Sequence, residues 1–266
     1  MTYTASAGWF SDVNGHAVVH VPLSAAMLSH ATSWADKGPH GIVWHYQAGC
    51  GGDLTSVQNA RGFPIIAFNI DQSGVIRQYM DARIAPWHAF DVSKYALGVE
   101  HAILPGTCDV NATMLASSSA LFAALIEWTR DTYGIDIPVK KIGPITPANY
   151  RTLSGIFGHL DIEPGSSLNP NRHGDTLLGM TWPEFLAAVE SEDDVTPEQA
   201  QTIKDAQAFL TALTKGLGQV DDPSKSATPT GAGTRVARGT LKLEKGPLTA
   251  YIPHDHTDGG QPRLKK

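Results

Sequence analysis

The chain has 266 residues, of which 42% are hydrophobic and 17% are charged, and its formal net charge is −6 at pH 7. This composition is that of a globular protein with a sizeable core, and it excludes a disordered or fibrous chain. The acidic balance argues against a nucleic-acid-binding protein, which would usually present a basic face. We therefore expect no nucleic-acid partner.

The sequence shows neither a membrane-spanning segment nor a secretory signal. No apolar run approaches the roughly 18 residues that a membrane-spanning helix needs, so no membrane insertion is expected. The first ten residues lack the basic and apolar regions of a secretory signal, which predicts a cytoplasmic product without a signal peptide. The two cysteines, Cys50 and Cys108, exclude a disulfide-rich scaffold and leave open whether they pair.

Changes in composition divide the chain into three parts. Residues 1–192 mix apolar runs, turn residues and aromatic residues, as a single α/β domain does. Residues 193–219 form a predicted linker helix, because a capping sequence at 196–199 opens it and Gly216 ends it. Residues 220–266 are rich in Pro, Gly, Ser, Thr and Lys and poor in large apolar residues, which predicts a disordered, low-complexity tail.

The linker helix at 197–215 also carries a pattern of its own. Apolar residues recur at alternating spacings of three and four, as in a coiled-coil seam: Ile203, Ala206, Leu210, Leu213 and Leu217. Two heptads are marginal on their own. We expect the helix to pack on the first domain of a monomeric protein, with self-association through 197–215 as the alternative.

The first domain is predicted to mix strands with helices. Strands are expected where short apolar runs lie between turn residues, and helices where a capping residue precedes an apolar periodicity. The expected strands are 41–46, 65–70, 75–79, 96–103 and 156–159, and the expected helices are 111–134 and one that begins at the capping box of 181–184. This order predicts an α/β fold with a single mixed central β-sheet flanked by helices.

Side chains suited to catalysis stand at or near the ends of these apolar runs. They are His45, His88, Glu100 and His159, followed by a loop segment with His173 and Asp175. A histidine at the end of a buried strand is more often a hydrogen-bonded structural residue than a ligand, so each one alone is weak evidence. The ordered set is a much more specific signal.

The region from Gly41 to Val189 resembles the N-acetylmuramoyl-L-alanine amidases of the type-2 amidase and peptidoglycan-recognition-protein family. The matching motifs are the strand that ends in His45, the hairpin at 68–78, Trp87-His88-Ala89, Leu97-Gly98-Val99-Glu100, and Gly158-His159 followed by His173-Gly174-Asp175. The resemblance implies a hydrolase that cuts the amide bond between N-acetylmuramic acid and L-alanine in bacterial peptidoglycan.

The missing signal and the appended tail further resemble endolysins of phages that infect actinobacteria. This likeness implies a bacteriolytic enzyme that stays in the cytoplasm of the infected host until lysis and then degrades the cell wall. Its partner would be bacterial peptidoglycan.

A metal site follows from the resemblance. The family binds one Zn²⁺ through two His and an Asp or Cys, which match His45, His159 and Asp175, and three protein ligands leave the fourth position open for water. The spacing of 16 residues from His159 to Asp175 is longer than is usual in the family. Asp161 and His173 therefore remain rival third ligands.

Roles beside the metal also come from the resemblance. Glu100 matches the acidic residue that takes the proton of the attacking water and passes it to the leaving amine. His173 stands where the family usually has a cationic donor that stabilises the oxyanion. His88 matches a histidine near the substrate, and we expect it and Trp87 to bind substrate.

Three alternatives remain at this stage. The first is a recognition module that holds peptidoglycan without cutting it, and the complete candidate ligand set argues against it. The second is an intracellular amidase that recycles soluble muropeptides, which would share the chemistry and differ in substrate. The third is an unrelated zinc peptidase, which the absence of a His-Glu-x-x-His run disfavours.

Overall fold

The computed structural model describes residues 3–170, 175, 177 and 179–192. The predicted linker helix at 197–215, the predicted tail at 220–266 and His173 lie outside the described residues, so the expectations made for them stay predictions. No helix within the described part of the chain is long and apolar enough to cross a membrane.

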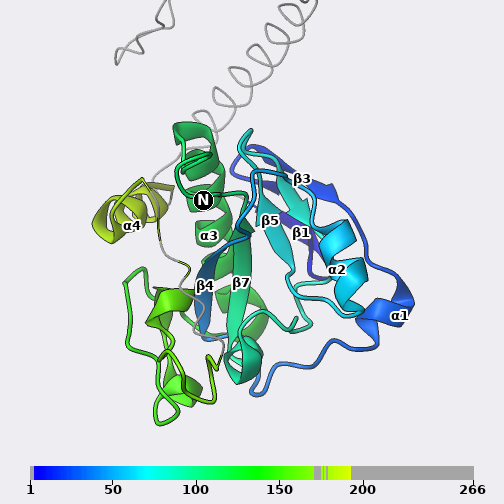
Figure 1. Ribbon diagram of the computed structural model, residues 1–266, viewed down its shortest axis with the longest axis vertical. Coiled ribbons are helices and arrows are strands. Elements are labelled where there is room, and N and C mark those ends of the chain that lie inside the picture. Colours follow the sequence, from blue (N-terminus) through cyan, green and yellow to red (C-terminus); the bar gives the residue numbers. More distant parts are fainter. Residues whose placement is uncertain (1–2, 171–174, 176, 178, 193–266) are drawn as a thin grey trace, which may run out of the picture. The chain divides into compact units, whose positions relative to one another are not determined.

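The described residues form eight strands and four α-helices, drawn in Figure 1. The strands are β1 (Tyr3–Ser6), β2 (Trp9–Val13), β3 (His16–His20), β4 (Gly41–Tyr46), β5 (Phe68–Ile70), β6 (Ile76–Gln78), β7 (Ala96–His101) and β8 (Gly155–Gly158). The α-helices are α1 (Ala25–Leu28), α2 (Thr55–Arg61), α3 (Ala112–Tyr133) and α4 (Trp182–Ser191). Short 3₁₀ turns at Phe90–Lys94, Tyr150–Thr152 and His159–Asp161 complete the set.

One mixed sheet contains all eight strands, in the order β1-β2-β3-β6-β5-β7-β4-β8. Strands β5, β7, β4 and β8 are parallel neighbours, β5 and β6 form an antiparallel hairpin, and β1 to β3 form an antiparallel meander at one edge. The predicted fold class, a single mixed sheet flanked by helices, is confirmed.

Strand β4 shows why its sequence is apolar throughout. Ile42 and Trp44 pack into the main core with α3, whereas Val43 packs into a second cluster on the opposite face of the sheet. A central parallel strand is covered on both faces and therefore needs apolar side chains on both. The strand predicted at 41–46 is confirmed with these bounds.

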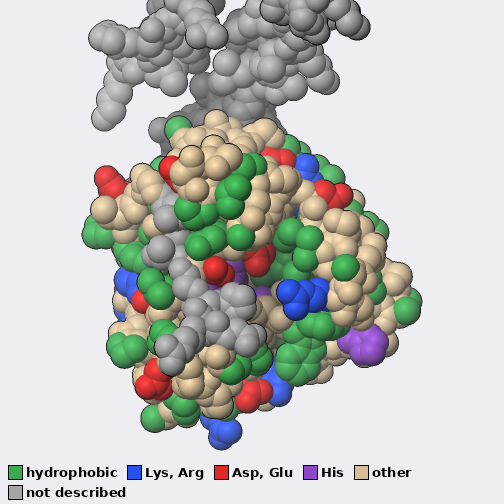
Figure 2. Space-filling view, in the orientation of Figure 1, with side chains coloured by type: hydrophobic (Ala, Val, Ile, Leu, Met, Phe, Trp, Pro, Cys, Tyr) green, Lys and Arg blue, Asp and Glu red, His purple; other side chains and the backbone are tan. Residues whose placement is uncertain are grey.

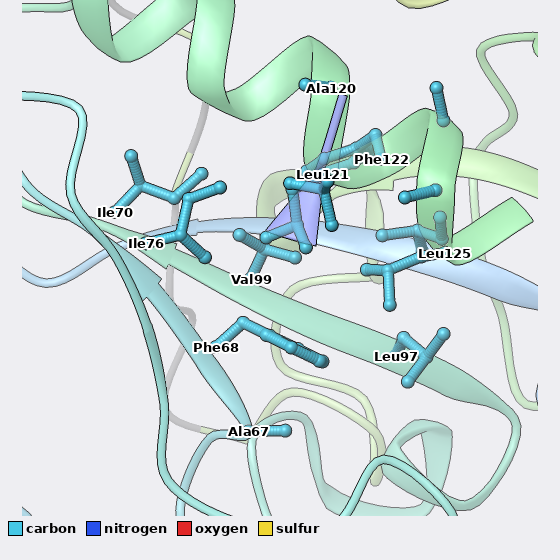
Figure 3. Packing of buried hydrophobic residues seen from close by; sticks show 14 of the residues in the cluster. Ala67, Phe68, Ile70, Ile76, Leu97, Val99, Ala120, Leu121, Phe122 and Leu125 are labelled. Atoms are coloured by element: carbon cyan, nitrogen blue, oxygen red, sulfur yellow. The ribbon is translucent and has the colours of Figure 1, made fainter. Parts of the chain in front are cut away.

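Helix α3 covers one face of the sheet and ends at the predicted caps. The side chain of Asn111 accepts a hydrogen bond from Met114 N at 2.9 Å, and Gly134 adopts the left-handed conformation that closes the helix. Apolar side chains of α3 face those of β5, β6 and β7 in Figure 3, where Leu121, Phe122 and Leu125 meet Phe68, Leu97 and Val99. Burial of this interface contributes a large part of the main core.

Helix α4 packs beside α3 and begins at the predicted capping box. The Thr181 side chain accepts a hydrogen bond from Glu184 N, and the Glu184 carboxylate accepts one from Thr181 N at 2.7 Å. Phe185 and Val189 of α4 are fully buried in the main core. The predicted start of the helix is confirmed.

Candidate metal centre and active site

Three of the predicted site residues lie in one row across neighbouring parallel strands. In the register of the sheet, His45 of β4 pairs with Glu100 of β7, and Trp44 of β4 pairs with Gly158, the last residue of β8. His159 directly follows Gly158, so it comes level with His45. The carboxyl ends of parallel strands meet at one edge, where ligands of open α/β sheets commonly bind.

Two of these side chains and Asp175 form a group that could hold a metal ion. His45 Nδ1 lies 3.1 Å from His159 Nδ1 and 3.2 Å from Asp175 Oδ2, and His159 Nδ1 lies 3.5 Å from the same carboxylate oxygen. His45 and His159 are buried, and Asp175 is partly buried. The structure therefore brings together the three side chains that the resemblance implies as ligands.

The size of this triangle fits zinc. A tetrahedral Zn²⁺ with bonds of about 2.0–2.1 Å needs ligand atoms about 3.3 Å apart, and the three separations lie on both sides of that value. Imidazole nitrogen and carboxylate oxygen are also the ligand types of catalytic zinc sites. The residues present thus fit the ion that the resemblance implies.

Backbone contacts hold Asp175 at the end of β8. Leu160 N donates to the carbonyl oxygen of Asp175 at 3.0 Å, and a Cβ at Gly158 would lie 3.0 Å from that same oxygen. Glycine therefore lets the loop approach the strand closely. Burial raises the pKa of the Asp175 carboxyl, but its contacts with the rings of His159 and His45 outweigh burial and leave this pKa well below its usual value.

Asp161, the rival third ligand, is engaged elsewhere. Its Oδ2 accepts a hydrogen bond from Gly158 N at 2.7 Å, and its Oδ1 lies 2.5 Å from Lys141 Nζ. The cause is local, because β8 ends at Gly158 and a 3₁₀ turn over His159–Asp161 carries the carboxylate away from the strand direction. His173, the other rival, lies outside the described residues, so the assignment of the third ligand stays a prediction.

Glu100 is paired with His45 in the sheet, and one of its carboxyl oxygens lacks a hydrogen-bond partner among the described residues. Its Oε2 is buried and has no hydrogen-bond partner among the described residues. Burial, with a smaller contribution from the charge of Asp175, raises the pKa of Glu100 to about 8. A carboxyl group with a pKa near neutrality is suited to taking up and releasing a proton.

Trp87 and His88 are the predicted substrate contacts. Both line a cavity whose wall also contains the metal group, that is His45, His159 and Asp175. His88 Nδ1 lies 2.9 Å from His45 Nε2, and His88 Nε2 lies 2.9 Å from the carbonyl oxygen of Ala96. The Trp87 side chain is 37% exposed, and its Nε1 donates to the carbonyl oxygen of His30 at 2.7 Å. Substrate binding by either residue stays a prediction.

The cavity has a volume of about 1010 Å³, and the metal group lies in its wall. Figure 2 shows acidic and histidine side chains in a hollow near the centre of the visible face. The sequence did not predict that six further residues line the cavity: Leu54, Val57, Arg61, Phe63, Ile65 and Phe90. Gly62, the left-handed cap of α2, was the signal that could have revealed that helix.

A disulfide between Cys50 and Cys108 answers the question that the sequence left open. It joins the loop after β4 to the segment after β7, two elements whose ends carry His45 and Glu100. In the first loop, Gln47 lines the cavity and its Oε1 accepts a hydrogen bond from Asn69 Nδ2 at 3.0 Å. The cross-link therefore ties one rim of the cavity to the sheet.

Comparison with known proteins gives structural likenesses only. No family model matches the chain, and no curated protein matches it. Among solved structures, the N-acetylmuramoyl-L-alanine amidase LysC from Clostridium intestinale is 16% identical, with 65% of this chain and 97% of that chain covered and a TM-score of 0.43.

Two further structures give similar values. An AmpD derivative is 19% identical, with 70% and 99% of the two chains covered and a TM-score of 0.47. The hydrolase AmiA from Staphylococcus aureus is 12% identical, with 66% and 82% covered and a TM-score of 0.44. Likenesses this low do not identify a function, which has to be inferred from the side chains of the site.

Proposed function

We propose that the protein is a zinc-dependent amidase that hydrolyses the amide bond between N-acetylmuramic acid and L-alanine in bacterial peptidoglycan. The single observation that carries the proposal is the group of His45, His159 and Asp175, whose ligand atoms all lie within 4.8 Å of one another beside a large open cavity. The choice of peptidoglycan as the substrate, and of this amide bond as the one cut, rests on the ordered sequence motifs around these residues.

The side chains around the site can be given roles in such a hydrolysis. His45, His159 and Asp175 would hold the ion in the wall of the cavity. When bound, Zn²⁺ would lower the pKa of a water molecule and polarise the amide carbonyl. Glu100 accepts the proton of the attacking water at its carboxylate and delivers it to the amine of L-alanine as that amine leaves.

The apolar wall of the cavity can exclude water and orient the substrate. Trp87 and Phe90 are both more than one-third exposed, at 37% and 39%, although they are large aromatic side chains. Exposed aromatic side chains at the rim of a cavity are typical of binding surfaces. Phe90 also has a φ of 47°, which is uncommon for a bulky residue, and strained residues of this kind cluster at functional sites.

An endolysin that acts on the cell wall is the form of this function that we favour. Disulfides persist in oxidising surroundings outside the bacterial cytoplasm, and the Cys50–Cys108 bond agrees with action there. An amidase that recycles muropeptides inside the cell would meet reducing conditions. A phage of an actinobacterial host remains the source suggested by the sequence resemblance.

Digestion of purified sacculi tests the proposal. The protein should lower the turbidity of the suspension and release free amino groups of L-alanine without new reducing sugar ends, and a chelator should abolish both effects. Binding to sacculi without release of end groups would make the protein a recognition module. Activity on soluble muropeptides without clearing of sacculi would make it a recycling amidase.

A further inference from the structure

The ring of His88 uses both of its nitrogens inside the protein. Its Nε2 lies 2.9 Å from the carbonyl oxygen of Ala96, which can only accept, so Nε2 must carry the proton. In a neutral ring Nδ1 is then an acceptor, and it lies 2.9 Å from Nε2 of His45. His45 must therefore be protonated at Nε2 and must have its lone pair at Nδ1.

That lone pair points at the other two members of the metal group. Nδ1 of His45 is the atom that lies 3.1 Å from His159 Nδ1 and 3.2 Å from Asp175 Oδ2. We propose that His88 is a positioning residue, which fixes the tautomer and ring orientation of His45 so that Nδ1 is ready to bind zinc. The inference rests on the proposed function in one respect, that His45 holds the ion.

The surrounding structure is built to seat the His88 ring. Trp87 N donates to the carbonyl oxygen of Pro64 at 2.9 Å, which fixes the loop directly before His88. Below the ring, Gly98 of β7 leaves space that no other residue would leave, because a Cβ there would lie 2.7 Å from His88 Cγ. The hydrogen-bonded chain from Ala96 through His88 to His45 thus begins and ends on the sheet.

A positioning role predicts a specific energetic signature. Residues that hydrogen-bond the far nitrogen of a metal-binding histidine typically contribute 10- to 100-fold to metal affinity. A residue that only contacts substrate would instead change KM and leave metal affinity as it was. Zinc affinity therefore separates the positioning role from the substrate contact that the sequence predicts for His88.

Three variants test the inference through zinc binding, measured by competition with a chromogenic chelator. His88→Leu removes the acceptor and should weaken zinc affinity about 10- to 100-fold. His88→Asn places an amide oxygen near the position of Nδ1 and should recover most of the affinity. Phe90→Leu, which changes the same cavity without touching His45, serves as the matched control and should bind zinc as the wild type does.

Wild-type affinity in His88→Leu, or an equal loss in His88→Asn and His88→Leu, would overturn the inference. If neither His88 variant folds, nitrogen-15 NMR of the wild-type zinc protein still decides the question. His45 should then be protonated at Nε2 and bind the ion through Nδ1, with a coupling across the hydrogen bond to His88 Nδ1. Metal bound through His45 Nε2 would contradict it, and a wild-type protein that binds no zinc would instead remove the proposed function.

Discussion

Glu100 lies directly opposite His45 in the register of the parallel strands β7 and β4. Paired residues of neighbouring strands point to the same face of a sheet, so the sheet itself places a carboxyl group beside a candidate metal ligand. No loop has to close to bring the two together. Glu100, the proposed proton carrier, and His45 of the candidate metal site thus stand on adjacent strands of one sheet.

Zinc content should depend on Asp175 and not on Asp161. Asp175→Ala removes one of three candidate ligands and is expected to lose stoichiometric zinc. Asp161→Ala breaks only the contacts with Lys141 and Gly158, so it should retain the ion. Elemental analysis of the purified proteins measures this, and full zinc occupancy in Asp175→Ala together with loss in Asp161→Ala would reverse the assignment.

Glu100→Gln should separate chemistry from metal binding. The amide has nearly the same shape but cannot carry the proton, so we expect zinc to remain while the rate on sacculi falls about 10²- to 10⁴-fold. Wild-type turnover by Glu100→Gln would remove Glu100 from the mechanism.

His173→Ala should likewise keep zinc and lose rate on sacculi. His173→Lys should recover part of the activity that His173→Ala loses if this position needs a cationic donor.

The stability of the metal-free protein should fall with rising pH because of Glu100. Burial raises the pKa of this group from 4.5 to about 8 in the folded protein. The folded state thus holds the proton more tightly, and the resulting stability is fully present below pH 4.5 and is lost as the pH passes through about 8. The change should be on the order of a few kcal/mol.

Urea unfolding in the presence of chelator at a series of pH values measures this contribution. Glu100→Gln cannot ionise and should lack that part of the pH dependence. The same pH profile of unfolding free energy in both proteins would show that Glu100 does not titrate as described.

The disulfide should stabilise the domain and the rim of the cavity. It joins two residues that are 58 positions apart in the chain, and the expected contribution of such a cross-link is about 2–4 kcal/mol. Cys50→Ser combined with Cys108→Ser should therefore lower Tm, and a reductant should lower the Tm of the wild type but not that of the double variant. Equal Tm values for wild type and double variant would contradict this expectation.

The parts of the fold that the sequence predicted are those with strong local signals. Strand β4 is a continuous apolar run, α3 lies between the Asn111 cap and Gly134, and α4 begins at a capping box. Each signal is contained within a few neighbouring residues. Local patterns of this kind need no knowledge of the tertiary structure.

The meander β1–β3 was missed because its strands are short, partly polar and at the edge of the sheet. A local signal was present nevertheless: Asn14-Gly15, which joins β2 to β3 with φ values of 46° and 88°, is a favoured hairpin turn sequence. The contact of His88 with His45 could not have been predicted, since it depends on how β4 pairs with β7, two strands that are far apart in sequence.

Hydrolysis of sacculi in water enriched in oxygen-18 tests the central claim most directly. If the protein cuts the bond proposed here, mass spectrometry of the products should find the label in the lactyl carboxylate of N-acetylmuramic acid, next to stem peptides with a free L-alanine amino group. Label at an anomeric carbon, or in a carboxyl group within the stem peptide, would show that a different bond is cut and would contradict the account.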